Sequence, residues 1–179
     1  MTEIIRGPGK VKFLEDKVFK SEIDFDEEFD HHCGIAHTRW ATHGAPSETN
    51  SHPQSVADND FTVVHNGILT NYFPLRCFLE KQGYHFKSET DTECIPILLK
   101  YLYDTKGEIY PSLVGSKVFQ VFETLRPTHK CLYMLLFGIL FYGKANTACS
   151  ECDLTFLQLV ERCVGQLEGA FAIVVKVKT

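Results

Sequence analysis

The sequence predicts an α+β fold, because short strand signals alternate with helical patterns along one chain. Strand-like runs occur at residues 11–14, 33–37, 61–65 and 170–177. Helical patterns follow residue 71, follow residue 90 and span residues 154–167. A chain of 179 residues can bury roughly two thirds of its unfolded surface, so one domain with a sizeable core is expected.

The strand predictions rest on runs of β-branched and other apolar residues. The runs are Val11 to Leu14, Cys33 to His37, Phe61 to His65 and Ala170 to Val177. The last run is almost continuously apolar, which is typical of a buried strand.

The first predicted helix begins after Asn71, a residue that commonly caps helices, and ends at Gly83. Its apolar face consists of Leu75, Phe78 and Leu79. Pro74 falls in the first turn, where no amide donor is lost.

The second predicted helix follows Thr90-Asp91-Thr92-Glu93, which has the form of a capping box, and continues to about Tyr103. Pro96 weakens this prediction, because a proline beyond the first turn removes a hydrogen bond. The third helix, Leu154 to Leu167, is expected to end before Gly169. The apolar stripes of the two helices are Ile95, Leu98, Leu99 and Leu102, and Phe156, Val160, Cys163, Val164 and Leu167.

Composition argues against several classes of partner. The formal net charge is -5 and no block of Lys and Arg occurs, so neither nucleic acid nor a membrane surface is expected. The seven cysteines show no CxxC spacing and no signal peptide precedes them, so we expect a reduced, cytoplasmic protein. The apolar run Cys131 to Tyr142 is shorter than the ~20 residues that a transmembrane helix needs.

Four polar signatures lie between His37 and Glu93. They are His37-Thr38-Arg39-Trp40-Ala41-Thr42-His43-Gly44, Ser51-His52-Pro53-Gln54, His65-Asn66-Gly67-Ile68 and Ser88-Glu89-Thr90-Asp91-Thr92-Glu93. Together they resemble the glutaminase domain of the glutamine:fructose-6-phosphate amidotransferases, class II amidotransferases of the N-terminal-nucleophile hydrolase superfamily. The resemblance covers Gly9 to about Asp104 and Asp153 to Val177, and it implies part of an αββα sandwich of two mostly antiparallel sheets.

The resemblance implies an enzyme that hydrolyses glutamine and passes the ammonia to fructose 6-phosphate, making glucosamine 6-phosphate for UDP-N-acetylglucosamine synthesis. The family places its catalytic cysteine at the mature amino terminus, whereas this chain begins Met1-Thr2-Glu3. We therefore expect residues 1–179 to be an incomplete domain without the nucleophile or the isomerase domains, and to be inactive alone. Cys33 in Cys33-Gly34-Ile35 does not replace the nucleophile, because its nitrogen is in a peptide bond.

The resemblance assigns residues to both ends of the substrate, L-glutamine. Arg39 would grip the α-carboxylate with its planar guanidinium, and the Thr42 hydroxyl would add a hydrogen bond. Asp91 would bind the α-amino group with help from Gly67, and His43 lies at a matching substrate-binding position. Asp91 also suits the start of a helix, where an acid is favourable.

Asn66 and Gly67 form the oxyanion hole in the matching family motif, which makes them the expected catalytic residues. From the residues alone, the same pair also predicts a tight hairpin turn. Trp40 matches a gate at the mouth of the ammonia channel, and its alternative role is a partly buried anchor. We expect His43 and His52 to be structural hydrogen-bonding residues.

Three further expectations concern what accompanies the domain. No cofactor and no metal are expected, since a zinc site from His31, His32, Cys33 and His37 would need a second ligand pair. The segment 116–152 matches nothing in the family and is predicted to be an insertion. The implied partners are the isomerase domains of a full-length enzyme, and the full-length form is expected to be a homo-oligomer. The alternative function is a non-catalytic glutamine-binding or subunit-contact module, or an unstable gene-model product.

Overall fold

The computed structural model describes residues 3–26, 34–41, 43–57, 59–105 and 156–177. Their elements in chain order are α1 (Val11–Phe19), β1 (Gln54–Val56), β2 (Phe61–Leu69), α2 (Tyr72–Lys81), the 3₁₀ turn η1 (Asp91–Glu93), α3 (Cys94–Asp104), α4 (Phe156–Val164) and β3 (Gly169–Val177). The α+β prediction is confirmed. The described residues form one three-stranded sheet covered by helices, and the two-sheet sandwich that the resemblance implies stays a prediction.

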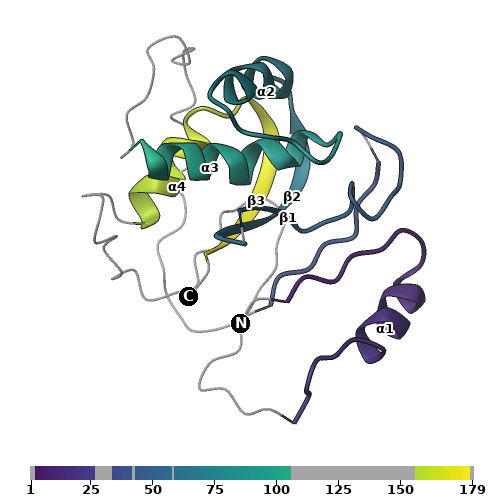
Figure 1. The fold of residues 1–179 in the computed structure, drawn as a ribbon. Coiled ribbons are helices and arrows are strands. Elements are labelled where there is room, and N and C mark those ends of the chain that lie inside the picture. The colour runs from purple at the N-terminus through teal and green to yellow at the C-terminus, as the bar shows by residue number, and fades with distance from the viewer. Residues whose placement is uncertain (1–2, 27–33, 42, 58, 106–155, 178–179) are drawn as a thin grey trace, which may run out of the picture.

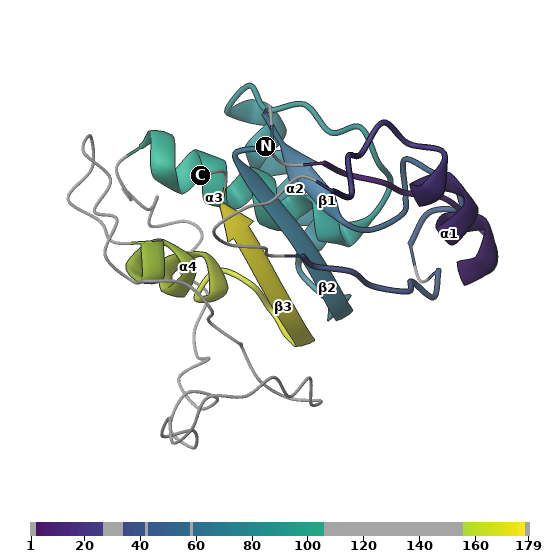
Figure 2. The same cartoon turned by 90° about the horizontal axis from the view of Figure 1, so that it is seen from below.

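The sheet has the order β1, β2, β3, and both neighbouring pairs are antiparallel. β2 is central, and its full length pairs with β3, from Phe61 opposite Val177 to Leu69 opposite Gly169. Figures 1 and 2 show α2 and α3 on one face of the sheet, with α4 beside α3. α1 lies at the opposite end of the structure from α4.

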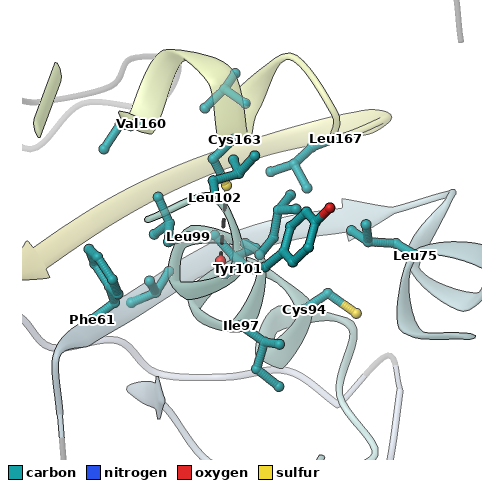
Figure 3. Packing of buried hydrophobic residues seen from close by; sticks show 14 of the residues in the cluster. Phe61, Leu75, Cys94, Ile97, Leu99, Tyr101, Leu102, Val160, Cys163 and Leu167 are labelled. Atoms are coloured by element: carbon teal, nitrogen blue, oxygen red, sulfur yellow. Dashed lines mark hydrogen bonds between the residues drawn. The ribbon is translucent and has the colours of Figure 1, made fainter. Parts of the chain in front are cut away.

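The hydrophobic core lies between the sheet and these helices. α3 is its centre, because eight of its eleven residues are buried and it contacts β1, β2, α2 and α4. Figure 3 shows Leu99 and Leu102 of α3 against Val160 and Cys163 of α4. Burial of this kind stabilises by roughly 1.5–3 kcal/mol per large apolar side chain. The core therefore fixes η1, which leads directly into α3.

The predictions for α2 and α3 are confirmed, but two details of their starts are wrong. The Asn71 side chain does not cap α2; it instead bonds the backbone of Gln166 and Glu168. The capping box is also wrong, since Glu93 accepts from the amides of Lys87 and Ser88 rather than from that of Thr90. Because η1 precedes α3, the Glu93 carboxylate turns toward the preceding loop.

Pro96 does not disturb α3. The helix begins at Cys94, so Pro96 is its third residue and lies in the first turn. The amides of that turn have no partner within a helix, and the missing donor therefore costs nothing.

The strand predicted at Val11 to Leu14 is wrong, because these residues begin α1. Val11, Leu14 and Val18 recur at helical spacing, and Lys12 forms ion pairs with acids three and four residues later. A four-residue window shows the alternation of Val11 and Phe13 but not this longer period.

The strand predicted at Cys33 to His37 is also not found. Residues 34–37 have no regular secondary structure, and Cys33 lies outside the described residues. Burial does alternate along residues 34–40, as in a strand, but no neighbouring strand pairs with this segment among the described residues. The short strand β1 was not predicted, because three residues are too few to show a period.

The strand predictions for β2 and β3 are confirmed, but the expected burial of β3 is wrong. Only Ile173 of β3 is fully buried, since β3 is an edge of the described sheet. The third predicted helix is confirmed as α4, which ends at Val164; Gly169 starts β3 instead of ending the helix.

The run Cys131 to Tyr142 and the segment 116–152 lie outside the described residues. No helix in the described ranges is both long and apolar enough to cross a membrane.

Candidate functional site

Asp91 is the buried acid of the site. It is 4% exposed, and its Oδ2 accepts a hydrogen bond of 3.0 Å from the amide of Leu69 at the end of β2. This bond joins η1 to β2, so the carboxylate is fixed beside the strand that carries Asn66 and Gly67.

His43 contacts both Asp91 and Arg39. Its Nδ1 is 3.9 Å from Oδ2 of Asp91, and its ring packs on Tyr72 with 4.6 Å between ring centroids. Nη2 of Arg39 donates hydrogen bonds to the backbone carbonyls of His43 and, at 3.1 Å, of Gly44. The structure therefore places a cation and an anion in contact with one histidine, the cation at its backbone carbonyl and the anion near its ring.

These two carbonyls hold the Arg39 side chain against its own loop. A bidentate grip on a carboxylate uses Nη2 together with Nε or Nη1. Binding of a carboxylate in this way requires Nη2 to exchange at least one carbonyl for a carboxylate oxygen. Thr42, the expected second ligand, lies outside the described residues.

Asn66 and Gly67 lie inside β2, so the predicted hairpin turn is wrong. The turn signal fails because β2 continues to Leu69 and pairs with β3 throughout. Gly67 has φ +139°, and a Cβ there would lie 2.2 Å from the carbonyl oxygen of Ala170. Only glycine fits this position without movement of β3.

His37 orients the amide of Asn66. Nδ2 of Asn66 lies 3.2 Å from Nε2 of His37, and since the amide nitrogen can only donate, the ring nitrogen accepts. This requires an unprotonated Nε2. Burial favours that state, because it lowers the pKa of His37.

The hydroxyl of Thr92 links two more histidines, His52 and His65. Thr92 Oγ1 lies 3.1 Å from Nε2 of His52 and 2.9 Å from Nδ1 of His65. A hydroxyl has one proton, so if the Thr92 hydroxyl donates to one ring, the other ring donates to it. Burial, with the neighbouring His37 and His65, lowers the pKa of His52 to about 4, and burial also lowers that of His65. The structural role expected for His52 agrees with this contact.

Trp40 is 90% exposed, so the alternative in which it is a partly buried anchor is wrong. The side chain follows Arg39 directly but packs on none of the core residues. Its role as a channel gate stays a prediction.

The buried thiols of the described residues do not suit nucleophilic chemistry. Burial raises the pKa of Cys94 to about 12 and raises that of Cys163 further, and only a thiolate attacks readily. Within the described ranges, no group of three or more His, Cys, Asp or Glu side chains is arranged to hold a metal ion. His31, His32 and Cys33 lie outside those ranges.

Sequence reasoning missed the supports of the site. His37, His65 and Thr92 directly precede or neighbour predicted residues in the signatures, but their pairing with one another has no local signal. Asn50 was also missed, although it lies just before the Ser51 signature.

Comparison with known proteins gives a consistent set of relatives. The family described as "Glutamine amidotransferase domain" matches residues 24–146. Glutamine--fructose-6-phosphate aminotransferase [isomerizing] 1 of Rattus norvegicus is 44% identical over 97% of this chain and 20% of its own length. Isozyme 2 of Homo sapiens is 43% identical over 97% of this chain and 20% of its own length.

A solved structure, the glutamine phosphoribosylpyrophosphate amidotransferase of B. subtilis, has a TM-score of 0.43 and 21% identity, covering 79% of this chain and 20% of that chain. Likeness at this level does not decide fold or function. The chain spans about a fifth of the length of the aminotransferases that it matches. The family match covers most of the chain and includes all four polar signatures, so this chain belongs to the glutamine amidotransferase domain family.

Proposed function

We propose that this chain is the glutamine-binding and glutamine-hydrolysing part of a glutamine–fructose-6-phosphate aminotransferase, and that it acts in the cytoplasm beside isomerase domains. The names of the relatives support this assignment. The ammonia released from glutamine is the nitrogen source for glucosamine 6-phosphate, and Trp40 is the proposed gate on its route.

The arrangement of Arg39, His43 and Asp91 carries the proposal. A free amino acid presents a carboxylate and an ammonium on one carbon, so its site needs a cation and an anion a short distance apart. Arg39 and Asp91 both contact His43, which supports binding of the α-carboxylate by Arg39 and of the α-amino group by Asp91.

The reaction also needs donors for a tetrahedral oxyanion, and we assign these to the side chain of Asn66 and the amide of Gly67. One such donor contributes about 3 kcal/mol to the transition state. The hydrogen bond to His37 keeps the Asn66 amide in a fixed orientation, which is what a preorganised donor requires.

The test is a titration of the purified chain with L-glutamine, measured by calorimetry and by the fluorescence of Trp40, the sole tryptophan. Arg39→Lys should raise Kd at least about tenfold, because a point-charge ammonium lacks the paired donors and a charged hydrogen bond contributes ~1.5–3 kcal/mol.

The matched control is Arg162→Lys in the last turn of α4, at an exposed position. It should leave Kd unchanged. A wild-type chain with no measurable affinity for glutamine, or equal affinities for the two variants, contradicts the proposed site.

A further inference from the structure

Asn50 connects the two loops that carry the charged groups of the site. Its Nδ2 donates to the carbonyl of Ala45 at 2.9 Å, and its Oδ1 accepts the amide of Glu89 at 3.0 Å. A second, longer contact of 3.4 Å joins Nδ2 to Oε2 of Glu89. Asn50 is 5% exposed, so these bonds are shielded from water.

Each of the two loops leads to one charge. Ala45 follows His43 and Gly44, whose carbonyls hold the Arg39 guanidinium. Glu89 stands two residues before Asp91. One amide side chain therefore bonds both the turn that seats the cation and the turn that precedes the anion.

Asn50 is itself held rigidly. Its backbone amide donates to Oγ of Ser47. The Nε2 atom of Gln54 donates to the backbone carbonyls of Thr49 and Ser51, the residues on either side of Asn50. A fixed side chain can set a distance between two loops, whereas a mobile one would follow their movement.

Gly44 shows how closely the loops approach. It has φ +75°, and a Cβ at this position would lie 2.7 Å from Nδ2 of Asn50 and 2.9 Å from Cβ of Glu89. Any other residue would separate the Arg39 turn from the Glu89 turn.

We propose that Asn50 is a positioning residue that sets the separation between the carboxylate-binding Arg39 and the amine-binding Asp91. It thereby determines the preference for a free α-amino acid over amides that carry only one of the two charges. This inference rests on the proposed function, because it takes glutamine as the ligand.

The preference follows from geometry. Two clamps at a fixed separation bind both ends of glutamine at once, so holding one end favours the other. If the separation varies, each clamp still binds its own group, but the gain from binding both is reduced. A residue that only stabilised the fold would weaken all ligands alike.

The experiment compares L-glutamine with two one-ended amides, glutaramate, which lacks the α-amino group, and 4-aminobutanamide, which lacks the α-carboxylate. Kd is measured for the wild type, Asn50→Ala and Asn50→Asp. The aspartate keeps an acceptor for the Glu89 amide but removes the donor to Ala45 and adds a charge beside Glu89. Asn59→Asp, in the turn between β1 and β2, is the control with the same chemical change.

Both Asn50 variants should raise the Kd of glutamine about tenfold, as expected for the loss of buried hydrogen bonds, and change that of the one-ended amides less than about threefold. Asn59→Asp should change none. Gly44→Ala, which displaces the same loops from the other side, should reproduce the Asn50 pattern. Thermal unfolding of each variant identifies any that fails to fold. If Asn50→Asp fails to fold, Gly44→Ala is the deciding variant, and if Gly44→Ala fails to fold, Asn50→Asp is.

An equal loss for all three ligands, or an unchanged preference for glutamine in folded variants, overturns the positioning role while leaving the proposed function intact. No glutamine binding by the wild type overturns both. The two failures are thus distinguishable in one set of titrations.

Discussion

Gly67 is the residue whose backbone conformation most restricts the site. Its φ of +139° lies in the region that favours glycine, and β3 passes directly against its α-carbon. A glycine also allows a substrate to approach the backbone closely, as the oxyanion role proposed above requires.

We predict that Gly67→Ala lowers the free energy of unfolding by at least roughly 1–3 kcal/mol, the cost of a residue in a sparsely populated backbone region, before the contact with Ala170 is added. Urea denaturation measures the loss. Gly7→Ala is the control, because a Cβ at Gly7 meets nothing within 4 Å. A Gly67 variant as stable as the Gly7 variant would show that β3 moves away freely.

At the level of elements, the Thr92 hydroxyl links η1 both to the loop that precedes β1 and to β2. His52 comes from that loop and His65 from β2, and the Thr92 hydroxyl bonds both rings. The positions of Asp91 and Asn66, each next to a member of this group, depend on it.

Thr92→Val should destabilise the fold by about 2 kcal/mol or more, since it leaves two buried ring nitrogens unpaired at ~1–3 kcal/mol each. Thr92→Ser keeps the hydroxyl and should cost only ~1 kcal/mol for the lost methyl group.

The control for this pair is Thr62→Val. Thr62 is equally buried, but its Oγ1 has no hydrogen-bond partner within the part of the chain that the structure describes. Its removal should therefore be neutral or stabilising. Equal losses for Thr92→Val and Thr62→Val in a denaturation series would show that the Thr92 bonds contribute nothing.

The success of the sequence predictions also differs between elements. The helices α2, α3 and α4 were predictable because each has a full apolar stripe, and β2 and β3 because their apolar runs are long. The strand prediction at the start of α1 is wrong because a four-residue window fits both the strand period and the helix period. The predicted site residues Arg39, His43 and Asp91 do meet at one place, but Asn50 and Thr92 support them through contacts across distant segments, which no local pattern encodes.

For the molecule as a whole, the buried histidines couple stability to pH. Burial lowers the pKa of His52 to about 4, and lowers the pKa of His37 and His65. Among the neighbouring groups, Arg39 acts in the same direction on His52, and Asp91 opposes it. In the unfolded chain these rings titrate near pH 6.5.

Between about pH 6.5 and 4 the unfolded chain therefore binds protons that the folded chain does not. The stabilisation is complete above pH 6.5 and is lost as the pH falls toward 4. We predict that the free energy of unfolding decreases from pH 7.5 to pH 5, and that His52→Gln reduces this slope. His85→Gln, at an exposed position, should keep the wild-type slope. Identical slopes for the two variants would contradict the role of His52.

The segment 116–152, which lies outside the described residues, stays a predicted insertion. The connection between Thr105 and Phe156 joins α3 to α4, which pack against each other. Doubling the length of such a connection costs only ~0.6 kcal/mol in closure entropy, so the core accommodates an insertion at this point.

The position of β3 has a consequence for biosynthesis. β2 carries Asn66 and Gly67, and one of its two edges is completed by β3, which is synthesised only after the long connection and the helices that separate the two strands. At ~5–20 residues per second, the interval between β2 and β3 is roughly 5–20 s. Throughout that time the strand with the proposed oxyanion donors is an open edge, exposed to pairing with a neighbouring nascent chain. Ribosome spacing on the message and chaperone access during this interval therefore bear directly on how much of the chain reaches the folded state.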